Sequence, residues 1–179
     1  SLYGDTALIG ATKDDPPSNS GSVYVFTRSS TDGMFTQQSK LHASDAAADD
    51  NFGFSVSLYG DTALIGAYGD DDNDKSSSGS VYIFKAPSPP PPSPPPSPPP
   101  LFLTSLVEYA TQPKFYASDT SAWGFGYALS LYGDTTLIYG GGSVYLFTRS
   151  SVDGTFTQQS KLHASDSTAD DRFGQSVSL

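Results

Sequence analysis

The chain has 179 residues, a net charge of −10 and no cysteine. Its length suffices for one domain with a sizeable core. The acidic balance argues against nucleic acid binding, because neutralising phosphates requires clustered Lys and Arg. Without cysteine, neither disulfide bonds nor thiol chemistry is available, and no apolar stretch approaches the length of a membrane span.

Three ordered sequence repeats organise the chain. An FG pair, a SLYGD turn and a GSVY strand each occur three times in the same order along the chain, and residues 35–45 recur identically as 156–166. The repeats divide the chain into units at 1–51, 52–124 and 125–172, followed by the first strand of a further unit at 173–179. The FG pairs begin at Phe52, Phe125 and Phe173, the SLYGD turns at Ser1, Ser57 and Ser130, and the GSVY strands at Gly21, Gly79 and Gly142.

Each unit predicts four short antiparallel strands, and no stretch has helical periodicity, so we expect an all-β fold. Apolar residues alternate with small ones over 52–58, which indicates a half-buried strand. Residues 62–67 and 81–84 are apolar on both faces, so we expect both strands to be covered on both sides. The mostly polar stretch 35–43 predicts an exposed edge strand.

Two features of the third unit carry separate expectations. Gly140, Gly141 and Gly142 stand where the other units have a longer loop, and they predict a tight turn between two strands. Trp123 is the only tryptophan of the chain. We expect it to pack in the core or between units rather than to form a platform for sugars.

Residues 87–100 contain only proline and serine. Because proline fixes its own φ and donates no hydrogen bond, the run predicts a polyproline II rod of roughly 43 Å. The run interrupts the second unit between its GSVYIF strand and its fourth strand, so an interdomain linker fits poorly. We expect a projection from the array of units or a strut along it.

The order of FG, a short alternating strand, a hydrophobic strand ending in GA and then G-x-V-Y resembles the FG-GAP repeat of β-propellers, as in the head of integrin α chains. The resemblance implies that each unit is one four-stranded blade. About three blades are fewer than the roughly 4–8 of a closed propeller. Thr12 and Tyr68 replace the proline of GAP, and the third copy has Ile138-Tyr139-Gly140. The calcium loop of integrin blades is here only Tyr-Gly-Asp, so calcium at that place is not implied.

The last two residues repeat the first two in phase, since Ser178-Leu179 matches Ser1-Leu2. We therefore expect the chain to be about one period of a longer tandem array, because stacked repeats need neighbours to bury their faces. An arbitrary boundary is the alternative. The blades could close into a ring with their neighbours or spiral open along a filament.

The proline run resembles the extensins of plants and the pherophorin-type wall proteins of green algae. That resemblance implies hydroxylated prolines, O-linked arabinose or galactose, and a location outside the cell. An inert spacer and a ligand for a proline-recognition module such as an SH3 domain are the alternatives. The expected modification sites are Ser88, Pro89, Pro90, Pro91, Pro92, Ser93, Pro94, Pro95, Pro96, Ser97, Pro98, Pro99 and Pro100.

No catalytic constellation is apparent, and we expect no enzyme activity. His42 and His163 occupy the same place in two copies of KLHASD, which favours a position on the blade surface. Glu108 is the sole glutamate, so no pair of acids with distinct environments can be named. No Ser-His-Asp order, HExxH motif or phosphate-binding glycine loop is found.

The acidic loops are the remaining candidate sites. Asp70, Asp72 and Asp74 alternate as in calcium loops, but Lys75 stands where such loops have glycine. A second acidic cluster, Asp49-Asp50-Asn51, precedes an FG strand. We expect no cofactor, because solvated acidic turns account for these clusters; calcium at Asp70, Asp72 and Asp74 is the alternative.

Two function hypotheses follow from the sequence. The first is an extracellular structural glycoprotein, a repeat unit of a fibre or of a cell-wall or surface assembly. Its partners would be copies of itself or adjacent repeats, and O-linked glycans. The second is a cell-surface adhesion or ligand-binding propeller, which would have divergent loops. Residues 27–45 and 148–166 are nearly the same, which favours the structural hypothesis.

Overall fold

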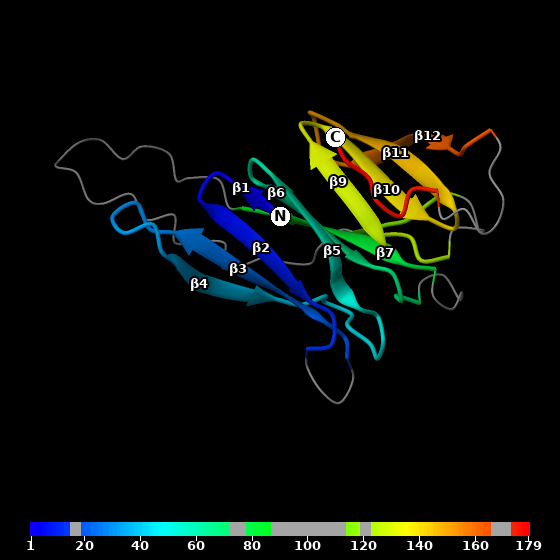
Figure 1. The fold of residues 1–179 in the computed structure, drawn as a ribbon. Coiled ribbons are helices and arrows are strands. Elements are labelled where there is room, and N and C mark those ends of the chain that lie inside the picture. The colour runs from blue at the N-terminus through cyan, green and yellow to red at the C-terminus, as the bar shows by residue number, and fades with distance from the viewer. Residues whose placement is uncertain (15–18, 72–77, 87–113, 119–122, 166–172) are drawn as a thin grey trace.

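The computed structural model describes residues 1–14, 19–71, 78–86, 114–118, 123–165 and 173–179. In this part of the chain all regular structure is β, arranged as three four-stranded antiparallel sheets (Figure 1). The expected all-β fold of tandem four-stranded units is confirmed. The first sheet contains β1 (Leu2–Tyr3), β2 (Thr6–Ala11), β3 (Ser22–Arg28) and β4 (Phe35–Leu41); the second β5 (Phe52–Tyr59), β6 (Thr62–Ala67), β7 (Ser80–Lys85) and β8 (Lys114–Phe115); the third β9 (Ala128–Tyr132), β10 (Thr135–Gly140), β11 (Ser143–Arg149) and β12 (Phe156–Leu162).

Each sheet is a simple meander, with its strands adjacent in chain order. Among the described residues, no helix has the length and apolar character needed to cross a membrane. The hairpin between β10 and β11 pairs Gly140 with Ser143, and Gly141 and Gly142 both have positive φ. Two such residues match the right-handed twist of the flanking strands, and the predicted tight turn is confirmed.

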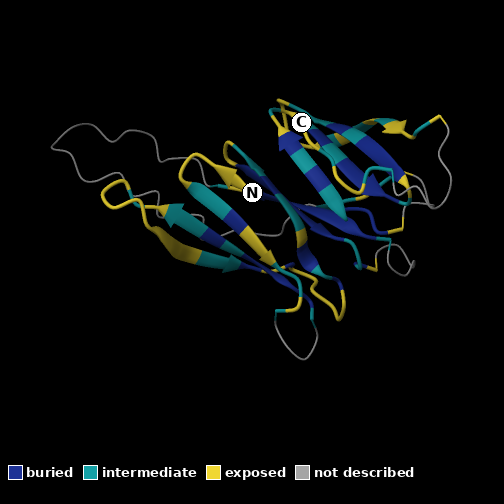
Figure 2. Cartoon of the chain, viewed as in Figure 1, coloured by how far each residue is buried: buried dark blue, intermediate teal, exposed yellow. Residues whose placement is uncertain are grey.

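The second sheet lies between the other two and is buried on both faces, as Figure 2 shows for β6 and β7. All six residues of β6 are buried. Side chains alternate along a strand, so Ile65 of β6 and Tyr82 of β7 enter a first core shared with the first sheet. Leu64 and Val81 enter a second core shared with the third sheet. The expectation that 62–67 and 81–84 are covered on both sides is confirmed.

The FG pairs lie at the joints between neighbouring sheets. Phe52 is fully buried in the first core, with its ring centroid 5.3 Å from that of Tyr82 and 5.9 Å from that of Phe84. Gly53 has a φ of 88°, and its backbone meets Gly10 of the preceding sheet so closely that a side chain at Gly10 would overlap it. The glycines of FG and of GA therefore face each other where two sheets approach.

The same hydrogen bond recurs along the stack. The amide of Leu58 donates to Ser1 Oγ over 3.0 Å, and the amide of Leu131 donates to Ser57 Oγ over 2.9 Å. The amide of Leu179 donates to Ser130 Oγ over 3.0 Å. The serine of each SLYGD turn thus accepts a bond from the leucine of the following copy.

Two expectations about aromatic residues are wrong. Trp123 is 65% exposed, so it is neither a core residue nor buried between sheets. Phe54 does not share the buried face of Phe52, because the β5–β6 register shifts between Phe52 and Ser55. Phe54 is instead 38% exposed, and its ring lies against those of Tyr68 and Tyr127 at 4.6 and 4.5 Å.

Candidate functional site

The most elaborate polar arrangement among the described residues lies at the joint between the first two sheets. We call it the joint cluster, and it consists of Asp45, Asp70, Tyr82 and Lys114. Asp45 lies on the segment that leads from β4 to β5, and Asp70 follows β6, whereas Tyr82 and Lys114 belong to β7 and β8. Segments on both sides of the joint therefore contribute to one set of contacts.

The hydroxyl of Tyr82 donates to Asp45 Oδ1 at 2.9 Å and lies 3.1 Å from Asp70 Oδ2. Lys114 Nζ pairs with Asp45 and lies 3.1 Å from Asp70 Oδ2. The same ammonium group lies 5.5 Å from the centroid of the Tyr82 ring. One ammonium group thus bridges two carboxylates, and the tyrosine hydroxyl lies within hydrogen-bond distance of both, which links the two sides of the joint.

The pKa values of the surrounding acids move in opposite directions. Burial acts to raise the pKa of Asp45, but hydrogen bonds from Lys114 and Tyr82 outweigh it and lower that pKa. Burial is also the main cause that raises the pKa of Asp50, whose carboxylate accepts from the Ala47 amide at 2.6 Å. The negative charges of Asp70, Asp45 and Asp71 raise the pKa of Asp50 further.

The first sheet contains a smaller version of this arrangement. Tyr24 donates a hydrogen bond to Asp14, and Lys40 Nζ lies 3.2 Å from Asp14 Oδ2 and 5.7 Å from the Tyr24 ring centroid. In the third sheet, Lys161 Nζ lies 5.4 Å from the Tyr145 ring centroid, and the Gly141-Gly142 turn stands in place of the acidic loop. The recurrence in the first two sheets indicates a structural clamp that belongs to the repeat.

Sequence reasoning did not identify this clamp. It singled out Asp70 for its neighbouring aspartates, and it did not pair Asp70 with a tyrosine and a lysine. The sequence does contain a pattern that could have revealed the clamp. In the first two units, the tyrosine of GSVY and the lysine of the fourth strand recur together with an acidic loop. Only the pairing of β7 with β8 brings Lys114 to Tyr82.

The predicted calcium ligands are only partly described. Asp70 is 5% exposed, and its Oδ2 already lies beside Lys114 and Tyr82, where a cation is in place. Asp72 and Asp74 lie outside the described residues. Among the residues that the structure describes, no group of three acidic or histidine side chains could hold a metal ion. Calcium binding by Asp70, Asp72 and Asp74 stays a prediction, which calorimetric titration of the chain with calcium would test.

The other candidate residues fall into two groups. All predicted modification sites from Ser88 to Pro100 lie outside the described residues.

His42 and His163 are both exposed, as expected for residues of the blade surface. His42 Nδ1 lies 3.3 Å from Ser22 Oγ. In the second sheet, Tyr116 stands at the position of His42, and the buried hydroxyl of Ser80, which corresponds to Ser22, has no hydrogen-bond partner among the described residues.

Comparison with known sequences agrees with this architecture. A family model described as FG-GAP repeat matches residues 1–26, 35–84 and 156–179, which together make up more than half of the chain. A comparison with curated proteins found no significant match. The matched segments include the FG pair of the second unit, the strands β2 and β6, most of β3 and β7, and the last FG pair. With three four-stranded sheets stacked in chain order, the chain is a propeller-type repeat domain and belongs to the FG-GAP repeat family.

Proposed function

We propose that this chain is a structural module of an extracellular glycoprotein that builds a fibre or a cell-wall or surface assembly. Its blades would supply a regular stack, and its proline run would carry O-linked glycans. Copies of the chain or adjacent repeats would be its partners. The observation that carries the proposal is the duplication, in structure as well as in sequence, of loops that a recognition protein would diversify.

The loops 29–34 and 150–155 illustrate this duplication. In the first loop, the Ser29 amide donates a hydrogen bond to the Met34 carbonyl oxygen at 2.9 Å, and the Met34 amide donates one to Asp32 Oδ1 at 3.0 Å. In the second, the Ser150 amide donates to Thr155 O at 2.8 Å, and Asp153 Oδ1 accepts the Thr155 amide at 3.1 Å. Two loops with the same internal bonds offer two equivalent surfaces, as a repetitive assembly requires.

The ion pairs beside these loops are also duplicated. Arg28 pairs with Asp5 at 2.8 Å in the first sheet, and Arg149 pairs with Asp134 at 2.9 Å in the third. Both pairs join the end of the GSVY strand to the aspartate of a SLYGD turn. Exposed pairs of this kind add little stability by themselves, so their recurrence reflects a repeated geometry.

The proposed glycosylation rests on the composition of residues 87–100 and on their resemblance to extensins and pherophorin-type proteins. An extracellular location is also in keeping with the FG-GAP family, to which the integrin α heads belong. A polyproline II run exposes every side chain to solvent, which suits modification by glycans.

Electron microscopy of the native material, with mass analysis of the same sample, tests the proposal. We expect filaments with a regular axial repeat, and pentose or hexose mass on the peptide that contains residues 87–100. A peptide that contains Pro113, which lies outside the run, is the internal control and should be unmodified. Discrete rings together with an unmodified proline run would contradict the structural role.

A ligand-binding role is the second candidate, and one observation favours it. Trp123 is 65% exposed and stands at the position that the buried Asp50 occupies in the preceding unit. An exposed tryptophan without a counterpart in the other repeats is what a platform for a sugar or protein ligand would need. Screening against glycans and cell-surface proteins tests this role. A specific ligand whose binding is lost in Trp123→Ala, but kept in Tyr132→Ala, would support it.

A further inference from the structure

The two joints of the stack are built from the same residue positions. At each joint the forward face of one sheet, formed by a leucine and two aliphatic residues, packs on the rear face of the next sheet, formed by an isoleucine, a tyrosine and a phenylalanine. The forward residues are Leu8, Val23 and Val25 at the first joint and Leu64, Val81 and Ile83 at the second; the rear residues are Ile65, Tyr82 and Phe84, and then Ile138, Tyr145 and Phe147.

A phenylalanine of an FG pair closes each joint. Phe52 packs on Tyr82 and Phe84, as described above. At the second joint the Phe125 ring centroid lies 5.6 Å from that of Tyr145 and 5.8 Å from that of Phe147. Phe52 and Phe125 are both fully buried. The joint is therefore a repeated aromatic contact that specifies how one sheet sits on the next.

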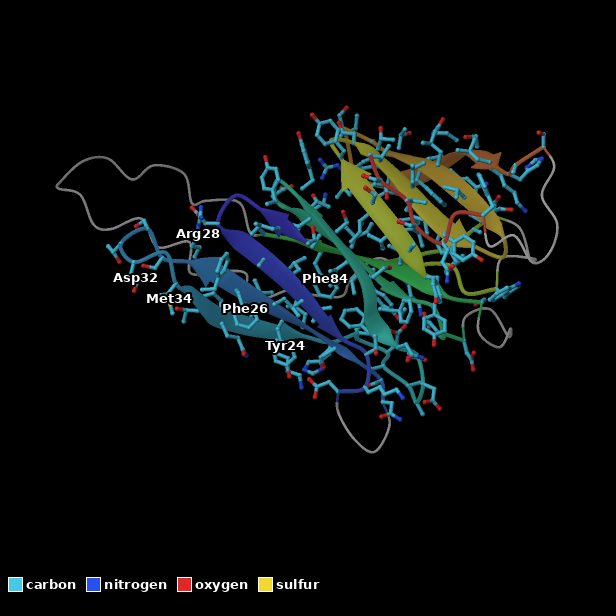
Figure 3. All side chains as sticks on the ribbon, viewed as in Figure 1. Tyr24, Phe26, Arg28, Asp32, Met34 and Phe84 are labelled. Carbon is cyan, nitrogen blue, oxygen red and sulfur yellow. The ribbon has the colours of Figure 1, made fainter. Side chains whose placement is uncertain are left out.

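The two surfaces that form each joint, a forward face and a rear face, also occur on the outer sheets of the stack. The rear face of the first sheet carries Ile9, Tyr24 and Phe26, at the positions of Ile65, Tyr82 and Phe84; Figure 3 labels Tyr24, Phe26 and Phe84. Ile9 is 53% exposed, whereas Ile65 and Ile138 are fully buried. Within the described part of the chain, no other sheet covers this face (Figure 1).

The forward face of the third sheet carries Leu137, Val144 and Leu146, at the positions of Leu64, Val81 and Ile83. Residues 173–179 form no strand, but two of their contacts with this sheet correspond to contacts that β5 makes with the first sheet. The Leu179 amide bonds to Ser130, and Gly174 packs against Val144. Phe173, which directly precedes Gly174 and is half-buried, occupies the position in the repeat that Phe52 and Phe125 have at the inner joints.

We propose that the forward face of the third sheet, with Phe173, packs on the rear face of the first sheet of a second copy of this chain. Phe173 of one copy would then meet Tyr24 and Phe26 of the other, in the contact that Phe52 makes with Tyr82 and Phe84. The two surfaces differ from each other, so the contact is head-to-tail and leads to a closed ring or an open filament. The inference rests on the proposed structural role and assigns the surfaces that serve it.

One residue makes this joint different from the inner two. Tyr139 stands at the position of Gly10 and Gly66, it is 6% exposed, and it packs against Gly174. Its ring centroid lies 5.9 Å from that of Tyr127. The last FG pair therefore contacts a tyrosine on the third sheet where the inner joints have a glycine.

Sedimentation velocity of the purified 179-residue chain over a concentration series tests the proposal. The variants are Ile9→Asp on the rear face and Leu146→Asp on the forward face, with Val152→Asp as the control. Val152 is 94% exposed in a loop and belongs to neither face. We expect the wild-type chain and Val152→Asp to associate alike, and each face variant to associate about a hundredfold more weakly, because an unpaired carboxylate is costly in an apolar contact.

Mixing the two face variants gives a sharper test. Each variant keeps one intact face, so the mixture should form heterodimers and stop there, at concentrations where each variant alone stays monomeric. Circular dichroism checks folding, and Phe173→Ser replaces Leu146→Asp if the latter unfolds the chain.

A wild-type chain that stays monomeric, or an Ile9→Asp variant that associates like Val152→Asp, would overturn the proposed contact. If the native material nevertheless forms filaments with a glycosylated proline run, the proposed structural role would still hold. Only the proposed interface would then be refuted.

Discussion

At the scale of single residues, the loop that connects the first two sheets shows how environment separates chemically identical groups. Asp45 and Asp50 are both aspartates on this loop, yet the pKa of Asp45 is lowered and that of Asp50 is raised. Asp45 reaches Lys114 and Tyr82 across the joint, whereas Asp50 is 2% exposed and faces other carboxylates. Their contributions to stability therefore depend on pH in opposite ways.

The raised pKa of Asp50 gives a prediction with a definite sign. A carboxyl group whose pKa is higher in the folded state destabilises the fold when it is ionised, at pH values above that raised pKa. Asp50→Asn removes the charge and keeps an oxygen for the Ala47 amide, so we expect a modestly higher Tm at pH 7. The gain should vanish below about pH 4, where the wild-type carboxyl is protonated in both states. Thermal melts from pH 3 to pH 8 provide the measurement, and a lower Tm for the variant at pH 7 would refute the assignment.

At the scale of strands and loops, close backbone approach at the joints governs which residues the strands tolerate. Gly66 of β6 faces Gly126 of the next unit, and the Ser55 hydroxyl donates to Gly126 O in the same place. Gly66 has no positive φ, so its lack of a side chain serves the approach of two sheets and not a turn.

Substitution at this approach should cost more than substitution at a turn glycine. A Cβ at Gly66 would overlap Gly126 O and Ser55 Oγ, so we expect Gly66→Ala to cost about 3 kcal/mol or more of unfolding free energy. Gly60 has a φ of 58° and nothing within 4 Å of its added Cβ, so Gly60→Ala should cost only about 1 kcal/mol. Urea denaturation of both variants measures the difference, and equal costs would show that steric overlap is not the cause.

The long connection between β7 and β8 gives a second prediction at this scale. It corresponds to residues 28–39 of the first sheet and 149–160 of the third, because Lys114 pairs with Tyr82 as Lys40 pairs with Tyr24 and Lys161 with Tyr145. Replacing residues 86–113 by the sequence of residues 28–39 shortens the connection that the fold must close. We expect the fold to persist and its unfolding free energy to rise by about 1 kcal/mol, because loop closure then costs less entropy. Urea denaturation, with far-UV circular dichroism to check the β content, provides the measurement. Loss of the β signal would show that residues 86–113 are needed to form the second sheet.

At the scale of the whole molecule, stability comes from the joints rather than from any sheet alone. The second sheet buries both faces only because the first and third sheets cover them. Each large apolar side chain buried there contributes roughly 1.5–3 kcal/mol. Stacked units of this kind are stabilised mainly by their neighbours.

The three FG phenylalanines should therefore differ in the cost of their truncation. Phe52→Ala and Phe125→Ala remove fully buried rings from equivalent places, and each should cost about 3–5 kcal/mol. Phe173 is half-buried, so Phe173→Ala should cost clearly less in the monomer. Thermal or urea unfolding at a low protein concentration makes the comparison. A Phe173 cost equal to the other two would mean that its ring is buried within a single chain.

Much of this fold could be predicted from local patterns in the sequence. The repeated FG, SLYGD and GSVY landmarks set the four-stranded units, and apolar residues on both faces of β6 and β7 implied cover on both faces. These features are local, because turn chemistry and side-chain alternation act within a few residues. The tight turn at Gly141 and Gly142 follows from the same rule.

Other features depended on which strands and loops meet in space. Trp123 is exposed although composition suggested burial, and Phe54 leaves the buried face because a register shift inserts it between paired residues. The joint cluster could not be read from spacing, because Lys114 reaches Asp45 and Asp70 only through the pairing of β7 and β8. The sequence by itself determined the strands and their repetition through short-range propensities. Only the tertiary structure decided which side chains fill the joints, because long-range contacts depend on register and on how the sheets stack.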